Sequence, residues 1–150
     1  DRNMLVIRKM KEMDIPAVAW LEAEIFPDPW SERALLDSYR QKRTLLLVAY
    51  EDQQLIGYLI MYYALEDGEI ARIAVIPQKR RQGVGARLLL ELENLCELGG
   101  ITRLLLDVRE SNGPAISFYT DYGFVQDGIR RRYYSDPVED GVLMSRDLGK

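Results

Sequence analysis

Residues 78–89 read Q-K-R-R-Q-G-V-G-A-R-L-L, and the interpretation of the whole chain starts from this stretch. It places four cations, Lys79, Arg80, Arg81 and Arg87, around two glycines where a helical pattern begins. The chain has 20 Lys and Arg against 24 Asp and Glu, a net charge of −4, so this cluster runs against the overall balance. Helix N-termini bind anions through unpaired amides and the helix dipole. The stretch therefore predicts an anionic ligand.

Two common phosphate-binding motifs do not fit these glycines. The Rossmann fingerprint needs three glycines in G-x-G-x-x-G, and the third is missing. A P-loop needs Gly-Lys-Ser/Thr, which does not follow. What remains is R-x-x-G-x-G, formed by Arg80, Gly83 and Gly85, where the absence of Cβ atoms lets the backbone approach a ligand closely. These features favour a pyrophosphate site over a plain glycine turn with solvated cations.

Composition limits the class of protein and its chemistry. The 150 residues suit one domain, expected to span 4–150 with Met4 as the native start, after Asp1 to Asn3. A single cysteine, no signal peptide and no apolar run of about 20 residues predict a cytoplasmic location. The absence of histidine excludes histidine-dependent catalysis and, together with the single cysteine, predicts that there is no metal site. A general base must be a carboxylate, a tyrosine, an amine or an ordered water.

Hydrophobic patterning predicts a single array of strands and helices. In chain order we expect a strand at 5–8, helices capped by Asp14 and Ser31, strands at 45–50, 55–65 and 69–76, a helix at 86–98, a strand at 103–109, a helix at 115–122 and two strands between 124 and 145. Consecutive hairpins followed by a strand–helix–strand unit predict a mixed, mostly antiparallel sheet. The expected fold class is α/β (α+β), with six to seven strands and about four helices.

The stretch I-A-V-I-P-Q-K-R-R-Q-G-V-G (73–85), followed by an amphipathic helix, resembles the acetyl-CoA site of the GCN5-related N-acetyltransferases. The order of strands and helices along essentially the whole chain is similar to their fold. The resemblance implies that one strand pairs with the pantetheine arm and that the glycine loop holds the pyrophosphate. The cofactor-binding residues that it implies are Ile73, Ala74, Val75, Arg80, Arg81, Gln82, Gly83, Val84, Gly85, Ala86, Asn112 and Tyr119.

Three more stretches resemble the bacterial ribosomal-protein-alanine N-acetyltransferases: F-P-D-P-W-S-E (26–32), L-D-V-R-E-S-N-G-P-A-I-S-F-Y-T-D-Y-G-F (106–124) and I-R-R-R-Y-Y…E-D-G-V-L-M (129–144). This resemblance implies acetyl transfer to the N-terminal alanine of a small-subunit ribosomal protein. Acetylation of another protein N-terminus, a lysine or a small amine is an alternative, as is a non-catalytic acyl-CoA-binding module. No nucleic acid or membrane partner is expected, and the chain is expected to be a monomer or a weak homodimer.

The same resemblance suggests catalytic roles. It implies that Tyr119 protonates the leaving sulfur and that Asn112 contacts the cofactor arm, although Tyr119 also fits a packed aromatic and Asn112 a helix cap. Asp107 occupies the position of a glutamate that is the proposed base of the related enzymes. It is one methylene shorter, so a water relay is open. Glu69, on the strand before the glycine loop, is the rival base, and Glu110 is a third choice.

Two segments, F-P-D-P-W (26–30) and R-R-Y-Y (131–134), are candidates for the acceptor groove, because the corresponding loops flank the acceptor in the family. The aromatic residues that we expect to line it are Trp30, Tyr133 and Tyr134. For Trp30, a place in the hydrophobic core is an equal alternative.

Overall fold

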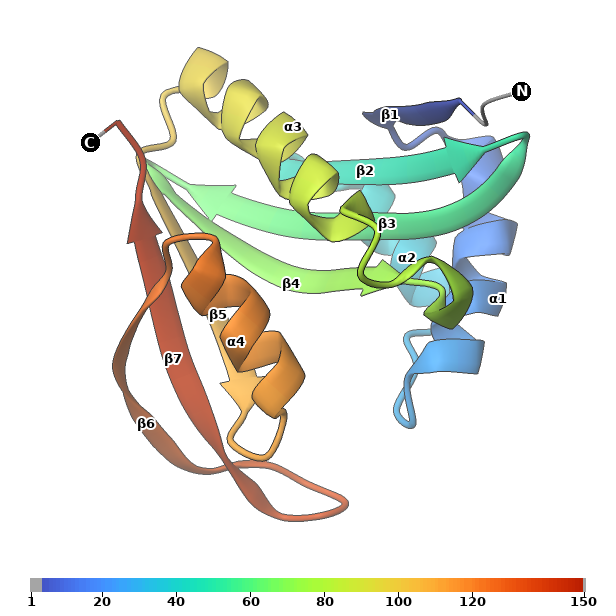
Figure 1. Ribbon diagram of the computed structural model, residues 1–150. Helices are drawn as coiled ribbons and strands as arrows, with labels where there is room; N and C mark the ends of the chain where they lie inside the picture. The colour runs from blue at the N-terminus through green and yellow to red at the C-terminus, as the bar shows by residue number, and fades with distance from the viewer. Residues whose placement is uncertain (1–3, 150) are drawn as a thin grey trace.

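The computed structural model describes residues 4–149, which form a seven-stranded sheet flanked by four α-helices (Figure 1). The strands are β1 (Leu5–Lys9), β2 (Thr44–Glu51), β3 (Gln54–Ala64), β4 (Asp67–Val75), β5 (Arg103–Arg109), β6 (Val125–Tyr134) and β7 (Glu139–Asp147). The helices are α1 (Ile15–Ile25), α2 (Glu32–Arg40), α3 (Val84–Gly99) and α4 (Gly113–Asp121), with 3₁₀ turns η1 (Glu12–Asp14) and η2 (Pro77–Lys79). The expected fold class is confirmed. The prediction made for residues 1–3 lies outside the described part.

The strand order is β1-β2-β3-β4-β5-β7-β6. Neighbouring strands are antiparallel except β4 and β5, which are parallel and are joined by α3, as the strand–helix–strand pattern predicts. The β4–β5 ladder covers only residues 67–69 and 103–105. Beyond it, β4 stays with β3 while β5 stays with β7, so the two strands diverge, as Figure 1 shows. This divergence separates the sheet into two halves.

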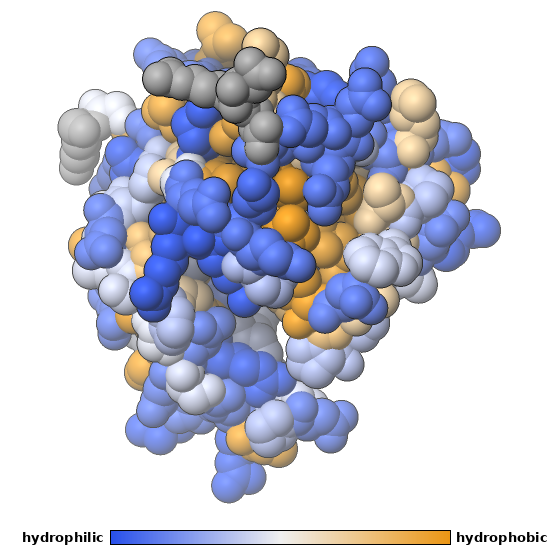
Figure 2. All heavy atoms as spheres, turned by 45° about the vertical axis from the view of Figure 1, so that its right-hand side comes forward, coloured by the Kyte–Doolittle hydropathy of each residue, from blue (hydrophilic) through white to orange (hydrophobic). Residues whose placement is uncertain are grey.

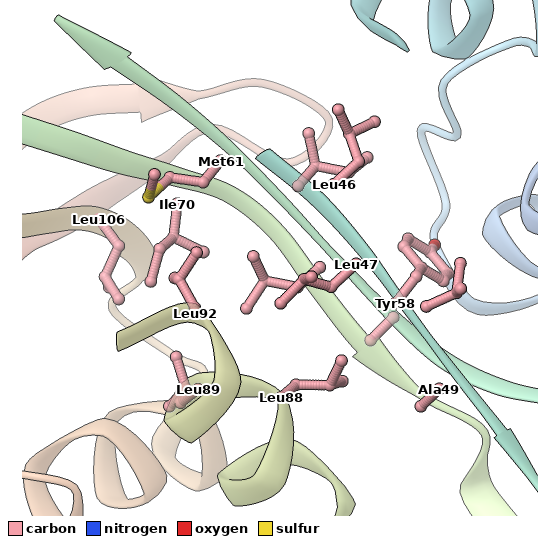
Figure 3. Packing of buried hydrophobic residues seen from close by; sticks show 14 of the residues in the cluster. Leu46, Leu47, Ala49, Tyr58, Met61, Ile70, Leu88, Leu89, Leu92 and Leu106 are labelled. Carbon is pink, nitrogen blue, oxygen red and sulfur yellow. The ribbon is translucent and has the colours of Figure 1, made fainter. Parts of the chain in front are cut away.

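The hydrophobic core lies between the sheet and its helices. Helices α3 and α4 cover one face, and α1 and α2 cover the other (Figure 1). On α3, Leu88, Leu89 and Leu92 are fully buried and point towards Leu47 and Ile70 of the sheet (Figure 3). Their i, i+1, i+4 spacing makes one apolar face, as the sequence indicates. Within residues 4–149, no helix is long and apolar enough to cross a membrane.

Helix α3 begins at Val84, two residues before the expected start at Ala86. Gly83 is its N-cap and has a left-handed backbone, with φ of 83°. Glycine adopts this conformation without the steric penalty of a Cβ atom, so the chain turns sharply there and the helix follows immediately. Val84, Gly85 and Ala86 therefore lie in the first helical turn, not in a preceding loop.

Asp14 holds the N-cap position of α1, but the expected cap bond is absent from its side chain. Turn η1 runs directly into α1, so Asp14 is itself helical, with φ of −80° and ψ of −19°. Its carboxylate accepts instead from the Lys11 N–H at 2.7 Å, from Arg8 at 2.8 and 2.9 Å, and from the Tyr50 hydroxyl at 2.8 Å. Asp14 therefore fastens α1 to strands β1 and β2, a tertiary role that its position in the sequence does not reveal.

This cluster predicts a loss of stability in acid. Burial by itself would raise the pKa of Asp14, but the hydrogen bonds from Arg8, Lys11 and Tyr50 lower it to about 2. A carboxyl with a lowered folded-state pKa stabilises the fold above its ordinary value and loses this contribution as the pH falls through about 2. We expect about 2 kcal/mol of unfolding free energy to be lost between about pH 4 and pH 2. Urea titrations of Asp14→Asn should lack that loss, whereas the exposed-site control Asp37→Asn should retain it.

Candidate active site

The start of α3 has the features of an anion site. The first amides of a helix have no partner within it, and Arg81, Gln82 and Arg87 are exposed around them. A surface pocket beside this helix start is lined by Leu5, Gln82, Gly83, Ala86, Arg87, Leu90 and Tyr122. The face of the molecule seen in Figure 2 is largely hydrophilic, with an apolar band exposed near its centre. Such a band is typical of a surface that binds another molecule.

Within residues 4–149, two of the four cations around the glycines have partners in the protein. Lys79 forms an ion pair with Glu51 at 2.5 Å. Arg80 donates from Nε to the carbonyl oxygen of Val75 at 3.0 Å, which ties the loop to the end of β4. The charge that faces a ligand therefore rests more on Arg81 and Arg87 than the sequence indicates.

Gly85 has a structural role beyond ligand approach. A Cβ atom there would lie 3.1 Å from Cζ of Phe118 on α4, closer than side chains normally pack. Phe118 in turn makes an edge contact with Tyr119, with ring centroids 5.2 Å apart. Gly85 thus lets α3 and α4 approach each other at the point where α4 presents Tyr119.

Gly85→Ala should therefore destabilise the protein by about 1–3 kcal/mol, the usual cost of overpacking, and weaken binding of the expected ligand, acetyl-CoA. Thermal unfolding and calorimetric titration would measure the two effects. Gly99→Ala is the matched control, because a Cβ at Gly99, on the same helix, meets nothing within 4 Å. An equal loss in both variants would show that helix α3 tolerates no added methyl and that the Phe118 contact is not the cause.

The three β4 residues expected to face the pantetheine arm lie beyond the end of the parallel ladder. Ile73 and Val75 are partly buried and Ala74 is 6% exposed. In this part of β4 the hydrogen-bonded neighbour is β3, and the side towards β5 is where the two strands diverge. This position fits an extended ligand that pairs with one strand edge.

Helix α4 places Tyr119 deep in the structure. The side chain is 7% exposed and makes edge contacts with Phe118 and Phe124. Burial raises the pKa of Tyr119, and the nearby Tyr134 hydroxyl raises it further. Asn112 caps the same helix by accepting from the Ala115 N–H at 3.2 Å, so the cap role is confirmed. Tyr119 is therefore protonated at neutral pH, so its hydroxyl is present as a donor.

Asp107 lies on the opposite face of the sheet. Leu106 and Val108 are buried on the face covered by α3 and α4, so alternation directs Asp107 to the other face. Its side chain is only 8% exposed and pairs with Arg130 at 2.8 Å. Burial and then the charge of Asp107 raise the pKa of Tyr134 to about 12. Tyr134 also raises the pKa of Tyr119. It therefore interacts with both candidate catalytic groups, Asp107 and Tyr119.

The other carboxylates are placed differently. Glu69 is exposed and stands opposite Leu105 in the parallel ladder, so it projects from the same face as Asp107. Its charge contributes to the raised pKa of Tyr133, after burial and the larger effect of Asp107. Glu110 is exposed at the end of β5. Asp107 and Glu69 are thus near each other, and Asp107 is the more enclosed.

A model of the acetyltransferase (GNAT) family matches residues 15–124, a range that includes the glycine loop, the diverging strands and Tyr119. The chain belongs to the GNAT acetyltransferase family.

Relatives of this GNAT protein cover nearly its whole length. A Bacillus subtilis (strain 168) protein is 34% identical over 144 residues, 95% of each chain. The ribosomal protein bS18-alanine N-acetyltransferase of Escherichia coli (strain K12) is 33% identical over 144 residues, 95% of this chain and 97% of that one. The crystal structure of the Escherichia coli enzyme superposes with a TM-score of 0.90 at 32% identity, covering 98% and 96% of the chains. PaiA N-acetyltransferase of Thermoplasma acidophilum, solved with coenzyme A, shares the fold, with a TM-score of 0.80 at 23% identity and coverage of 97% and 99%.

Trp30 of this GNAT domain is held by a buried polar network that sequence reasoning missed. Glu22, on α1, is fully buried and accepts from the Trp30 N–H at 3.0 Å, from Arg72 Nε at 2.9 Å and from the Tyr58 hydroxyl. The Arg72 guanidinium lies 3.9 Å from the ring centre of Phe26 and 5.3 Å from that of Trp30. The loop after α1 is therefore anchored to β3 and β4, next to the diverging strands. The signal available in the sequence was that Glu22 and Arg72 are charged residues flanked by apolar ones.

The tyrosines of β6 are positioned by the neighbouring strands. Tyr133 and Tyr134 form an edge-to-face pair with ring centroids 5.0 Å apart. A Cβ at Gly141 of β7 would lie 3.3 Å from both rings, so this glycine makes room for them. Arg109 stacks over Tyr134 at 4.6 Å and pairs with Glu139 at 3.2 Å. Arg109, Glu139 and Gly141 all lie in the stretches quoted for the family resemblance, but the sequence did not show that they pack around these tyrosines.

Proposed function

We propose that this protein transfers an acetyl group to the N-terminal alanine α-amine of a small-subunit ribosomal protein. As a GNAT acetyltransferase it takes that group from acetyl-CoA, which supplies an activated thioester. The observation that best supports acetyl transfer is the placement of two side chains. A buried, protonated Tyr119 and a nearly buried Asp107 lie on opposite faces of the sheet where β4 and β5 diverge. The identity of 33–34% to the relatives supports the choice of acceptor.

The glycine loop and the β4 edge would bind the donor. The unpaired amides of Val84 to Ala86, with Arg81 beside them, suit the pyrophosphate, while Arg80 holds the loop against β4. The backbone of Ile73 to Val75 suits the pantetheine arm. Asn112 closes the N-terminus of α4 on the same side and is proposed to contact that arm.

Proton transfers are divided between the two faces. Asp107 takes the proton from the acceptor amine, directly or through a water, and the neutral nitrogen attacks the thioester carbon. Tyr119 donates its hydroxyl proton to the sulfur as the carbon–sulfur bond breaks. The surplus proton on the new amide nitrogen then leaves through solvent and restores the Tyr119 hydroxyl. Trp30, Tyr133 and Tyr134 flank the acceptor path on the Asp107 side. Glu69 is exposed on that face and is the alternative base.

The free energy of deprotonation favours an α-amine as acceptor. An α-amino group has a pKa of ~7.8 and a lysine side chain a pKa of ~10.4. Neutralising them at pH 7 therefore costs about 1 kcal/mol for the α-amine and about 4.6 kcal/mol for the lysine. A site without histidine, in which a short carboxylate acts as base, is better matched to the smaller cost. With a ribosomal protein as acceptor, we place the reaction in the cytoplasm, carried out by one domain spanning residues 4–150 as a monomer or weak homodimer.

The first experiment follows thiol release from acetyl-CoA with two peptides. One copies a ribosomal protein N-terminus that begins with alanine, and the other is N-terminally blocked and contains lysine. We expect release with the free N-terminus only, and mass mapping should place the acetyl group on the α-amine. Release with the blocked peptide alone would make the protein a lysine acetyltransferase. Acetyl-CoA binding without release from any amine would indicate a binding module.

Asp107→Asn should then lower kcat about 10- to 100-fold, at or below the low end of general-base catalysis, because water can relay part of the proton transfer. Glu69→Gln, which removes a carboxylate from the same face, should change kcat less than about threefold. The two variants would be compared at saturating acetyl-CoA across pH 6–9. The reverse ranking would assign the base to Glu69.

A further inference from the structure

Arg130 forms an ion pair with Asp107 that the proposed reaction does not require. Its Nε lies 2.8 Å from Oδ1 of Asp107. The two side chains differ in exposure, since Asp107 is 8% and Arg130 is 49% exposed. A nearly enclosed carboxylate therefore has a cation resting on its open side, where an acceptor amine must arrive.

The surroundings of Asp107 suit a single small cation. The Arg130 guanidinium lies 5.5 Å from the ring centre of Tyr133, so it sits between the carboxylate and an aromatic face. Tyr133 and Tyr134 both lie close enough for the charge of Asp107 to influence them. An alkyl ammonium fits the same position, because aromatic faces and carboxylates attract any cation.

Arg130 can leave this position without disturbing the core. It lies on β6, an edge strand of the sheet, whose residues 125–133 are all exposed. Its partner across the ladder is Gly141, which offers no side chain to hold it. The β6–β7 pairing is irregular between Arg130 and Tyr134, and Arg132 has a φ of 51°. A displaced guanidinium would enter water directly.

We propose that Arg130 competes with the acceptor for Asp107. Its guanidinium fills the cation position beside Asp107 until the ammonium form of the acceptor amine displaces it. The proposal rests on the function proposed above, in which Asp107 receives the amine. At neutral pH an α-amine is largely an ammonium ion and can exchange for Arg130, charge for charge. The contact therefore raises the KM for the acceptor and disfavours acceptors that arrive uncharged.

Steady-state kinetics of Arg130→Gln test the proposal. The KM for the alanine peptide should fall about two- to fivefold, the range that corresponds to a partly exposed ion pair, with kcat within about twofold of wild type. Arg130→Lys, which retains a cation, should stay nearer to wild type. Arg131→Gln removes the same charge from the next position and should leave KM unchanged, which separates a direct contact from a general field effect. A raised KM, or a lower kcat at unchanged KM, would overturn the proposal.

A binding measurement separates this proposal from the proposed function. The Arg130 Nε–H resonance, assigned by its loss in Arg130→Gln, is followed by NMR while the alanine peptide is added to the CoA-bound protein. The signal should shift as the ion pair breaks, and an acetyl-blocked peptide, which has no ammonium, should leave it unchanged. A resonance that is unaffected by the free peptide would contradict the proposal even if acetyl transfer occurs. Displacement without acetyl transfer supports it and counts against the proposed function.

Discussion

Tyr119→Phe is expected to lower kcat about 10³-fold, within the usual range for loss of a general acid. The hydroxyl is the one group removed, and the ring contacts with Phe118 and Phe124 remain. Because burial and Tyr134 raise the pKa of Tyr119, the wild-type hydroxyl stays protonated throughout the neutral range. Without this hydroxyl the leaving thiolate has to take its proton from water.

The measurement is kcat for the alanine peptide together with the dissociation constant of acetyl-CoA. We expect the dissociation constant and the thermal midpoint to change little, because the hydroxyl has no role in holding the fold together. Tyr39→Phe, on α2 across the sheet, removes the same atom and should leave kcat unchanged. A Tyr119→Phe enzyme that keeps more than about a tenth of its activity would rule out Tyr119 as the acid.

Glu22→Gln is expected to destabilise the protein by about 3–5 kcal/mol, the usual cost of removing one partner of a buried ion pair. The substitution keeps the volume but removes the 2.8 Å ion pair of the Arg72 guanidinium, which is 15% exposed, and leaves it the longer contact with Asp28 at 3.9 Å. The Trp30 N–H and the Tyr58 hydroxyl also donate to this carboxylate, so three donors lose a charged acceptor together. Thermal unfolding should show a fall of roughly 10 °C in the midpoint.

Two further variants test this explanation. Glu24→Gln lies two residues along the same helix on its exposed side, and it should be nearly neutral. Arg72→Met combined with Glu22→Gln should cost less than the sum of the two single changes, because the buried charge is then absent. Additive losses would show that the ion pair does not couple α1 to β4.

Because the network also holds Trp30, Glu22→Gln should raise the acceptor KM before the protein unfolds.

Local pattern determined much of the fold. The leucine spacing of α3, the apolar runs of β2 and β5 and the serine cap of α2 are local signals, and the structure has each element within a few residues of its expected place. The glycine loop and the Asn112–Tyr119 spacing likewise lie within one segment each. The family resemblance then indicated both the donor site and Tyr119, because these short motifs carry their function in their own backbone and helix geometry.

Relations between distant segments came only from the tertiary structure. Glu22 and Arg72 are 50 residues apart, and Asp107 and Arg130 are 23 apart, so no local pattern indicates that each pair meets. From the sequence, Gly85 is a ligand-binding glycine and Asp14 is a helix cap. The structure adds that Gly85 makes room for Phe118 of α4 and that Asp14 pairs with Arg8. Periodicity determines which face of an element is buried. Which charges are enclosed together, and with what pKa, depends on how the finished sheet brings those faces into contact.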